Sequence, residues 1–177
     1  GIRNFVLGLK GKDRILRDIS APTCTICGIN AGYTGPGCKT VLPRKAMAKV
    51  GFRLVPNQDP PDILRKLRKH LNKHGFSQIE IKGYQATKPF RTPLDAEISK
   101  IVIESAKEIY GREPVVYPTF IATGPMSNLC GRLNIPCVSI GVGNAQSRMH
   151  GPNENIKISD FIEGIKHISL IMEKLGR

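Results

Sequence analysis

Tryptophan is absent from the sequence, and aromatic residues make up only 6% of its 177 positions. Acidic residues are few as well, with 14 Asp and Glu against 27 Lys and Arg, which leaves a net charge of +13. No hydrophobic run is long enough to cross a bilayer, so the sequence predicts no membrane-spanning helix. The five cysteines are an odd number, which favours a reduced, cytoplasmic protein over a disulfide scaffold.

The sequence also lacks a signal peptide, and it opens with Gly1 rather than methionine. We therefore expect it to begin partway through a longer polypeptide. A hydrophobic content of 40% and a charged content of 23% are typical of a globular protein with one or two domains.

The strong positive charge favours an anionic partner such as nucleic acid. The basic residues are scattered along the chain, however, with one dense patch in residues 65–73. Few aromatics are available to stack on bases, and no RNA-binding signature is present. Charge spread over solvated faces is the simpler interpretation, and a basic nucleic-acid binder stays open as an alternative.

A glycine-rich stretch, GYTGPGCKTVLPRK at 32–45, raises the question of a phosphate-binding loop. Such a loop needs a glycine directly before the lysine, but Cys38 separates Gly37 from Lys39. Pro43 would also interrupt a helix that began after Thr40. We predict instead a turn that joins two strands.

The first half of the chain is expected to form a small α+β unit. A short helix in 5–20 leads to strands at 23–31 and 45–55, a helix from Asp59 to Gly75, and a strand at 78–82. Cys24 and Cys27 form a lone CxxC, which we interpret as packing rather than zinc binding. His70 and His74 are spaced i, i+4 without a nearby glutamate, which favours solvated histidines at a helix end.

The pattern changes near residue 90 to alternating helix and strand, which is typical of an α/β fold. We expect a helix capped by Thr92-Pro93 and ending at Tyr110, a strand near 115–120, and a short helix to Leu133. A buried strand at 136–142 and a last helix at about 158–175 follow.

The stretch 141–156, GVGNAQSRMHGPNENI, lies just past the end of that buried strand, where open α/β sheets place their ligands. His150 stands on this polar loop. Neutral imidazole binds zinc well, although a lone loop histidine is more often only solvated.

Two long motifs point to a family. GYTGPGCKTVLPRKAMAKVGFRLVPNQDP and SRMHGPNENI closely resemble the two-metal aminoacylases, dipeptidases and carboxypeptidases, such as acetylornithine deacetylase, succinyl-diaminopimelate desuccinylase and carnosinase-like dipeptidases. The match runs in register from about Pro22 to Leu175. It implies an α/β catalytic domain with an inserted α+β lid that also forms a homodimer. Residues 1–21 would be a helical lead-in, 22–90 part of the lid, and 91–177 the last part of the catalytic domain.

The resemblance also implies site residues. Arg53 matches the arginine that binds the substrate carboxylate, Thr40 a polar position near the substrate, and Thr123 and Gly124 the turn that contacts the substrate through its backbone. His150 matches the ligand of one of two metals, usually zinc. Gly51 departs from the family, in which an aspartate is usual.

Other parts of the family's site have no match in this sequence. These are an H-x-D motif, a bridging aspartate, a Glu-Glu pair that includes the general base, and a further carboxylate. We therefore assign no catalytic residue here and expect this chain alone to be inactive on small peptides or N-acyl amino acids. A non-catalytic dimerisation module derived from the family is the alternative.

Overall fold

The structure is a computed structural model, and it describes residues 5–83, 86–120 and 122–177. The chain divides into two compact units. The first comprises the described residues of Gly1–Pro89 and of Ile121–Thr123, and the second those of Phe90–Phe120 and Gly124–Arg177.

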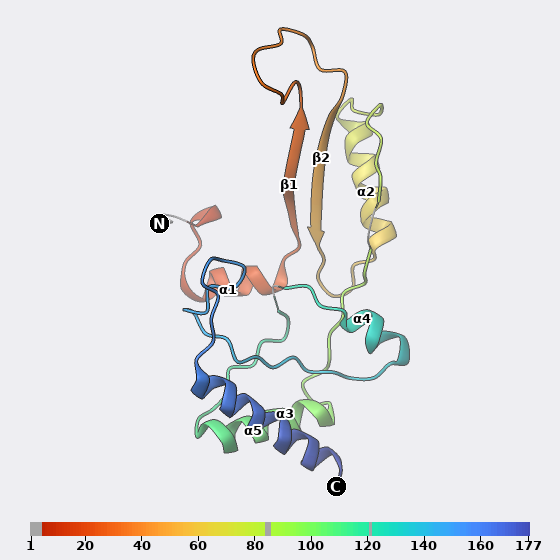
Figure 1. Ribbon diagram of the computed structural model, residues 1–177. Coiled ribbons are helices and arrows are strands. Elements are labelled where there is room, and N and C mark those ends of the chain that lie inside the picture. The colour runs from red at the N-terminus through yellow and green to blue at the C-terminus, as the bar shows by residue number, and fades with distance from the viewer. Residues whose placement is uncertain (1–4, 84–85, 121) are drawn as a thin grey trace. The chain divides into compact units, whose positions relative to one another are not determined.

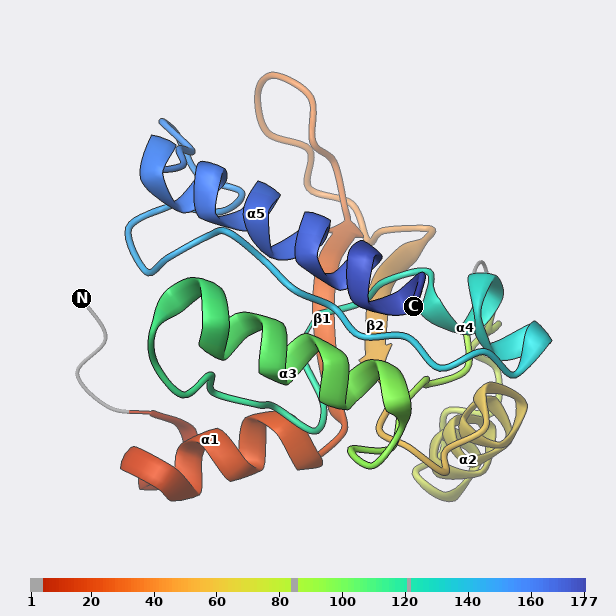
Figure 2. The same ribbon diagram turned by 90° about the horizontal axis from the view of Figure 1, so that it is seen from below.

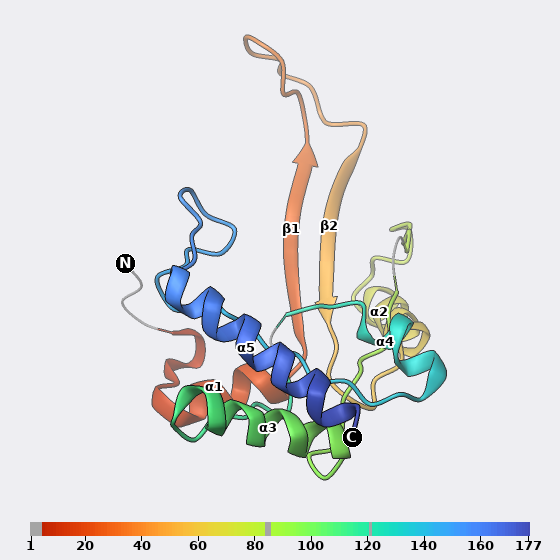
Figure 3. The same cartoon turned by 60° about the horizontal axis from the view of Figure 1, so that its bottom comes forward.

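The first unit is built around an antiparallel pair of strands, β1 (Thr23–Ala31) and β2 (Ala46–Arg53), drawn as neighbouring arrows in Figures 1 and 3. The register runs from Thr23 opposite Arg53 to Ala31 opposite Ala46, with a β-bulge between Ile26 and Gly28. The β-branched residues of TCTICGINA and the alternation in AMAKVGFR favour this extended pairing. Loop 32–45 joins the strands, as the sequence predicted, and no helix follows it directly.

Two short helical segments precede the hairpin. The predicted helix at 5–20 is split into a 3-10 turn, η1 (Val6–Gly8), and α1 (Gly11–Ser20). The break coincides with left-handed backbone at Leu7 and Gly8, which an α-helix does not continue through.

Helix α2 (Pro60–Lys73) lies on the β2 side of the hairpin (Figure 1). Asp59 occupies the predicted N-cap position, yet its side chain makes no capping hydrogen bond and instead pairs with Lys88 at 3.6 Å. In the first turn, a hydrogen bond from Lys66 holds the pKa of the Asp62 carboxyl below its usual value, with Arg65 contributing further.

The expected strand at 78–82 is absent from the structure, where these residues are irregular. Their neighbour is α2: the guanidinium of Arg68 donates hydrogen bonds to the carbonyls of Ser77 at 3.3 Å and Ile79 at 2.7 Å. An extended segment becomes a strand only when another strand pairs with it, and the sheet of this unit contains β1 and β2 alone among the described residues.

The second unit is organised by two long helices, α3 (Glu97–Tyr110) and α5 (Ile158–Leu175), which lie side by side in Figures 2 and 3. Between them in sequence come α4 (Met126–Leu129) and the 3-10 turn η2 (Gly131–Leu133). The bounds of α5 agree with its apolar periodicity. Val102 and Ala106 form the buried hydrophobic core among the described residues, and both belong to α3.

Three expectations for the second unit were wrong. Helix α3 begins at Glu97 rather than after the expected cap at Thr92. The Thr92 hydroxyl does not cap a helix, because it donates to the carbonyl of Cys137 at 2.6 Å and accepts from the N–H of that residue at 2.9 Å. Residues 115–120 and 136–142 form no strand in the described part of the chain. A segment becomes a strand only when a neighbouring strand offers it hydrogen bonds, and none does so among the described residues.

The chain exposes a large surface, 14777 Å². A compact protein of this mass exposes about 8,500 Å², and two separate domains of half the mass together about 10,000 Å². Large apolar side chains stand in water on both units, among them Ile29, Leu42 and Ile168. Each unit therefore carries large apolar side chains that its own residues leave exposed.

Candidate functional site

Arg53 is the last residue of β2, and its exposed guanidinium is held by one contact. Its Nη1 donates a hydrogen bond of 2.6 Å to the hydroxyl oxygen of Thr123. The structure therefore brings together two of the residues that the family resemblance singled out. A guanidinium has five donors, so those left over can bind a carboxylate bidentately.

Gly51 lies two positions before Arg53, on the same face of β2. A Cβ atom at Gly51 would stand 3.2 Å from the sulfur of Cys27, the extra residue of the β-bulge. The aspartate that is usual in the family at this position would therefore have to displace the Cys27 thiol. Gly51 and Cys27 are therefore packed closely, and a side chain at position 51 requires the Cys27 thiol to shift slightly.

Thr40 is not brought to Arg53. It is exposed on loop 32–45, which extends from the opposite end of the hairpin (Figure 1). Seven residue steps separate Ala46 from Arg53, so that end of β2 is about 23 Å from Arg53.

Gly124 follows Thr123 directly and belongs to the second unit. A Cβ atom there would lie 3.2 Å from the terminal methyl carbon of Met126. Because that methyl belongs to a flexible side chain, the position is crowded rather than closed to larger residues.

His150 is exposed on the loop that precedes α5, and its backbone is left-handed, with φ of +62°. Arg148 and Asn153 share this conformation, with φ of +52° and +59°. The backbone N–H of His150 donates to the Glu154 carboxylate at 3.3 Å. Left-handed residues other than glycine are uncommon and cost free energy, so neighbouring contacts must hold this loop in shape.

A polar network supplies those contacts. The buried Ser147 hydroxyl accepts a hydrogen bond from the N–H of Asn144, and the Asn144 side chain donates to Asp160 at 3.1 Å. The Asn155 amide donates to the carbonyls of Gln146 and Asn153. The network ties the loop that carries His150 to the first turn of α5.

The two metals that the resemblance implies do not fit the residues present. Within the described residues, no group of three or more His, Cys, Asp or Glu side chains comes close enough to hold a metal ion. A catalytic zinc requires about three protein ligands, and His150 offers one. His70 and His74 lie together, with ring centroids 4.5 Å apart, but on exposed α2 and with no third donor.

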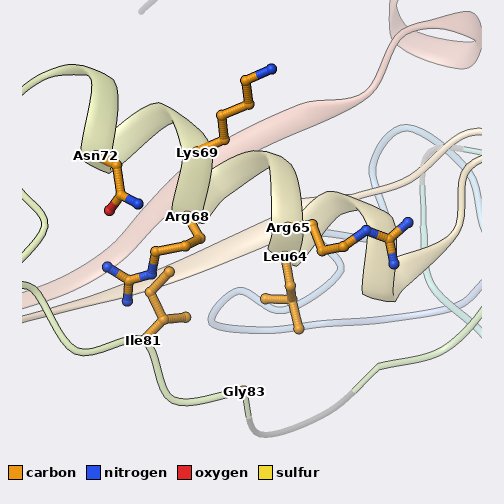
Figure 4. A pocket seen from close by; sticks show the side chains of 7 residues that line it. All are labelled: Leu64, Arg65, Arg68, Lys69, Asn72, Ile81 and Gly83. Carbon is orange, nitrogen blue, oxygen red and sulfur yellow. The ribbon is translucent and has the colours of Figure 1, made fainter.

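An open groove of about 580 Å³ runs along α2 (Figure 4). Its basic side chains are largely occupied: Arg65 pairs with Asp62 at 3.1 Å, and Arg68 donates to backbone carbonyls. We therefore do not regard it as a substrate site. The groove is lined by Leu64, Arg65, Arg68, Lys69, Asn72, Ile81 and Gly83.

Sequence reasoning missed one further contact in the second unit, in which the Thr92 hydroxyl makes hydrogen bonds to both backbone groups of Cys137. The two residues are 45 positions apart, so no local pattern marks them. Separately, no helix in the described part of the chain combines the length and apolar character needed to span a membrane.

Comparison with known proteins gives a consistent result. A family model described as Peptidase family M20/M25/M40 matches residues 3–174. The Cys-Gly metallodipeptidase DUG1 of Saccharomyces cerevisiae is 25% identical over 178 residues, covering 93% of this chain and 35% of that protein. The Beta-Ala-His dipeptidase of Mus musculus is 22% identical over 165 residues, covering 88% of this chain and 33% of that protein. This chain spans about a third of the length of these relatives.

Solved structures agree. The crystal structure of an M20 family metallo-carboxypeptidase from Sulfolobus solfataricus is 41% identical, with a TM-score of 0.84, and the match covers 97% of this chain and 39% of that one. Human carnosine dipeptidase 1 is 22% identical with a TM-score of 0.77, over 96% of this chain and 36% of that one, and this shows a shared fold. The resemblance drawn from the two motifs is confirmed. The chain belongs to peptidase family M20/M25/M40, a family of hydrolases.

Proposed function

We propose that this chain is the C-terminal part of a metal-dependent peptidase that cleaves small peptides or N-acyl amino acids with a free carboxylate. The observation that supports it best is the contact between Arg53 and Thr123. It presents a guanidinium, partly fixed in position, at the end of a strand. The relatives named above are dipeptidases and a carboxypeptidase, whose names denote substrates that are small peptides or peptide C-termini.

In this proposal residues 22–90 are part of a lid and residues 91–177 the end of the catalytic domain. Arg53 binds the substrate carboxylate, and Thr123 and Gly124 line the substrate. The family resemblance also assigns Thr40 a place near a substrate in the complete enzyme, although within this chain its loop extends from the end of β2 opposite to Arg53. His150 provides one imidazole to a metal, typically zinc in this family. The remaining ligands and the general base belong to the rest of the parent protein, so this chain alone is inactive. Its large uncovered surface supports a larger parent.

The test begins with antibody against this chain and the cells from which it comes. The antibody should isolate a polypeptide well above 19.5 kDa that hydrolyses dipeptides and loses activity with a chelator. Recombinant chain should show no such activity and no stoichiometric zinc. An isolated product of 19.5 kDa without peptidase activity would overturn the proposal.

A second candidate is a non-catalytic dimerisation module. It is favoured by exposed apolar side chains on both strands, including Ile26, Ile29 and Met47. It is also favoured by the outer edge of β1, which pairs with no other strand among the described residues. Unpaired edges readily pair with another chain. Sedimentation of the purified chain tests it: a concentration-independent dimer supports the module, and a monomer at high micromolar concentration removes it.

Within the complete enzyme we also propose a homodimer through the lid and a cytoplasmic location. Nucleic acid is a weaker candidate partner, because Asp62, Glu80 and Glu163 neutralise several of the lysines and arginines in ion pairs. Absence of DNA and RNA binding at low salt would remove it.

A further inference from the structure

His70 and His74 stand one helical turn apart at the C-terminal end of α2. The N–H of His74 donates to the carbonyl of His70 at 3.2 Å, which is the hydrogen bond of a regular α-helix. The spacing is therefore helical, although His74 already occupies the C-cap position. Residues four apart on a helix are neighbours on one face, and both of these histidines are exposed to solvent.

Hydrogen bonds anchor the backbone that carries the second histidine. The N–H of Phe76 donates back to the carbonyl of Leu71 at 2.9 Å, which closes the helix end as a Schellman motif. Gly75 supplies the left-handed conformation that this closure requires, with φ of +83°. The guanidinium of Arg68 also holds the following segment, 77–79, by its carbonyls. The end of α2 is therefore fixed on both sides of the histidine pair.

The two imidazole rings have a separation and a tilt that suit a shared metal ion. Their centroids are 4.5 Å apart, and their planes are inclined by 46°. A ring nitrogen binds zinc at about 2.0–2.1 Å, which puts each ring centroid about 3.2 Å from the ion and the centroids of two adjacent ligands about 4.5–5.2 Å apart. Parallel stacked rings could not hold one ion in both of their planes, whereas inclined rings can. The ring geometry adds to the helical spacing an arrangement that favours metal binding over two solvated histidines.

The surroundings of the pair set limits on the ion. The C-terminal end of a helix carries partial negative charge, which favours a cation. Lys69 and Lys73 stand next to the histidines in sequence and oppose a cation, but both are exposed, so water and salt screen them. Within the part of the chain that the structure describes, no third His, Cys, Asp or Glu joins the pair in a metal-binding group. Water must fill the remaining coordination positions, so the ion would exchange readily and be lost on purification.

We propose that His70 and His74 form a two-histidine site for an exchangeable divalent transition metal, such as Zn²⁺, Ni²⁺ or Cu²⁺. Imidazole is a favoured ligand of these ions, whereas Mg²⁺ and Ca²⁺ prefer oxygen donors. The bound ion joins the last turn of α2 to its cap and stabilises that helix end, because it binds the folded chain better than the unfolded one. Both histidines belong to the first unit, so the site does not depend on the role proposed for His150.

Zn²⁺ alone is the probe, and NMR of the histidine side-chain nitrogens in the intact chain is the readout. The four histidines give separate signals, so zinc that binds to free cysteines does not obscure the result. We expect the signals of His70 and His74 to shift together and to saturate with a single affinity, while Mg²⁺ leaves them unchanged. In His70→Ala or His74→Ala the remaining histidine should bind about tenfold more weakly or worse, because the second imidazole no longer acts on the same ion.

The double variant Asn72→His/His74→Asn is the matched control. It keeps the number of histidines and moves one to the position of Asn72, which lines the groove along α2 (Figure 4). Histidines two apart on a helix do not face each other, so zinc affinity should fall to that of the single variants. The proposal is overturned if His70 and His74 titrate separately in the wild type with the weak affinity of His150, or if the control binds zinc as tightly as the wild type. The wild-type titration needs no variant, so a folding defect in one of them would not obscure it.

Discussion

Arg53 at the end of β2 and Thr123, seventy positions later in the chain, are joined by a hydrogen bond of 2.6 Å from guanidinium to hydroxyl. The bond orients the guanidinium before any ligand arrives. Replacing Thr123 by Val keeps the shape of the side chain and removes the acceptor. We expect Thr123→Val to make the Arg53 side chain more mobile and to weaken carboxylate binding by about threefold, because hydrogen bonds at exposed sites contribute modestly.

Nitrogen relaxation of the Arg53 side chain measures its mobility in the free chain, and titration with N-acetylglycine measures binding. Thr123→Ser retains the hydroxyl and should behave as the wild type. Unchanged Arg53 mobility in Thr123→Val would contradict the positioning of Arg53 by Thr123. A wild-type chain with an ordered Arg53 that ignores N-acetylglycine would count against the carboxylate role of Arg53 and leave the positioning intact.

Replacing Ser105 on α3 by alanine should stabilise the protein. Its side chain is 0% exposed, and its hydroxyl has no hydrogen-bond partner among the described residues. Burying an unpaired hydroxyl is costly, so Ser105→Ala should raise the free energy of unfolding by about 1 kcal/mol. Ser99 on the same helix is the matched control, because its buried hydroxyl donates to Pro93 at 2.9 Å and Ser99→Ala should destabilise. Thermal denaturation of both variants measures the two changes in stability. Equal destabilisation by Ser105→Ala and Ser99→Ala would show that the Ser105 hydroxyl makes a hydrogen bond after all.

Gly164 of α5 is buried against Val142, and a methyl group at this position would overlap Cγ1 of the valine. We expect Gly164→Ala to lower the free energy of unfolding by about 1–3 kcal/mol, although alanine is the better helix former. Denaturant titration measures this. The double variant Gly164→Ala/Val142→Ala should recover part of the loss, since it removes the overlapping methyl groups. A stabilised Gly164→Ala would mean that α5 does not approach Val142 in solution.

Tyr110 should make the free energy of unfolding depend on pH in alkaline solution. Desolvation, with smaller contributions from Glu163 and Asp160, raises the pKa of the Tyr110 hydroxyl above its ordinary value of 10.0. As pH rises past 10.0, the unfolded chain releases this proton before the folded chain does, so stability falls with pH in that window. Tyr110→Phe should therefore lose less stability than the wild type between pH 9 and 11, as measured by urea denaturation. If the wild type and Tyr110→Phe lost the same stability over this pH range, titration of groups other than Tyr110 would cause the loss.

Local pattern predicted the helices best. The apolar periodicity of ISDFIEGIKHISLIMEKL places α5, and the Asp-Pro-Pro start and Gly75 place α2. Both signals lie within the element itself, since a helix satisfies its own backbone. The β1–β2 hairpin was also predictable, because its two strands are neighbours in sequence.

Non-local partners account for the failures. Residues 78–82, 115–120 and 136–142 look like strands in composition, but a strand needs a partner that composition does not reveal. Thr92 resembles a helix cap and instead braces Cys137, 45 positions away. The family resemblance singled out Arg53 and Thr123, yet their contact became visible only in the structure. The roles of Arg53, Thr40, Thr123, Gly124 and His150 stay predictions.

The scarcity of buried apolar side chains should have a calorimetric signature. Unfolding a compact protein of 177 residues raises the heat capacity by about 2–2.7 kcal/mol/K, because hidden apolar surface becomes hydrated. In this chain much of that surface is hydrated already, so its thermogram should show a broad, shallow transition with a heat-capacity step well below that range. In the complete enzyme that we propose, the rest of the protein would cover these faces, and the missing part of the heat-capacity step would appear when that complete enzyme unfolds.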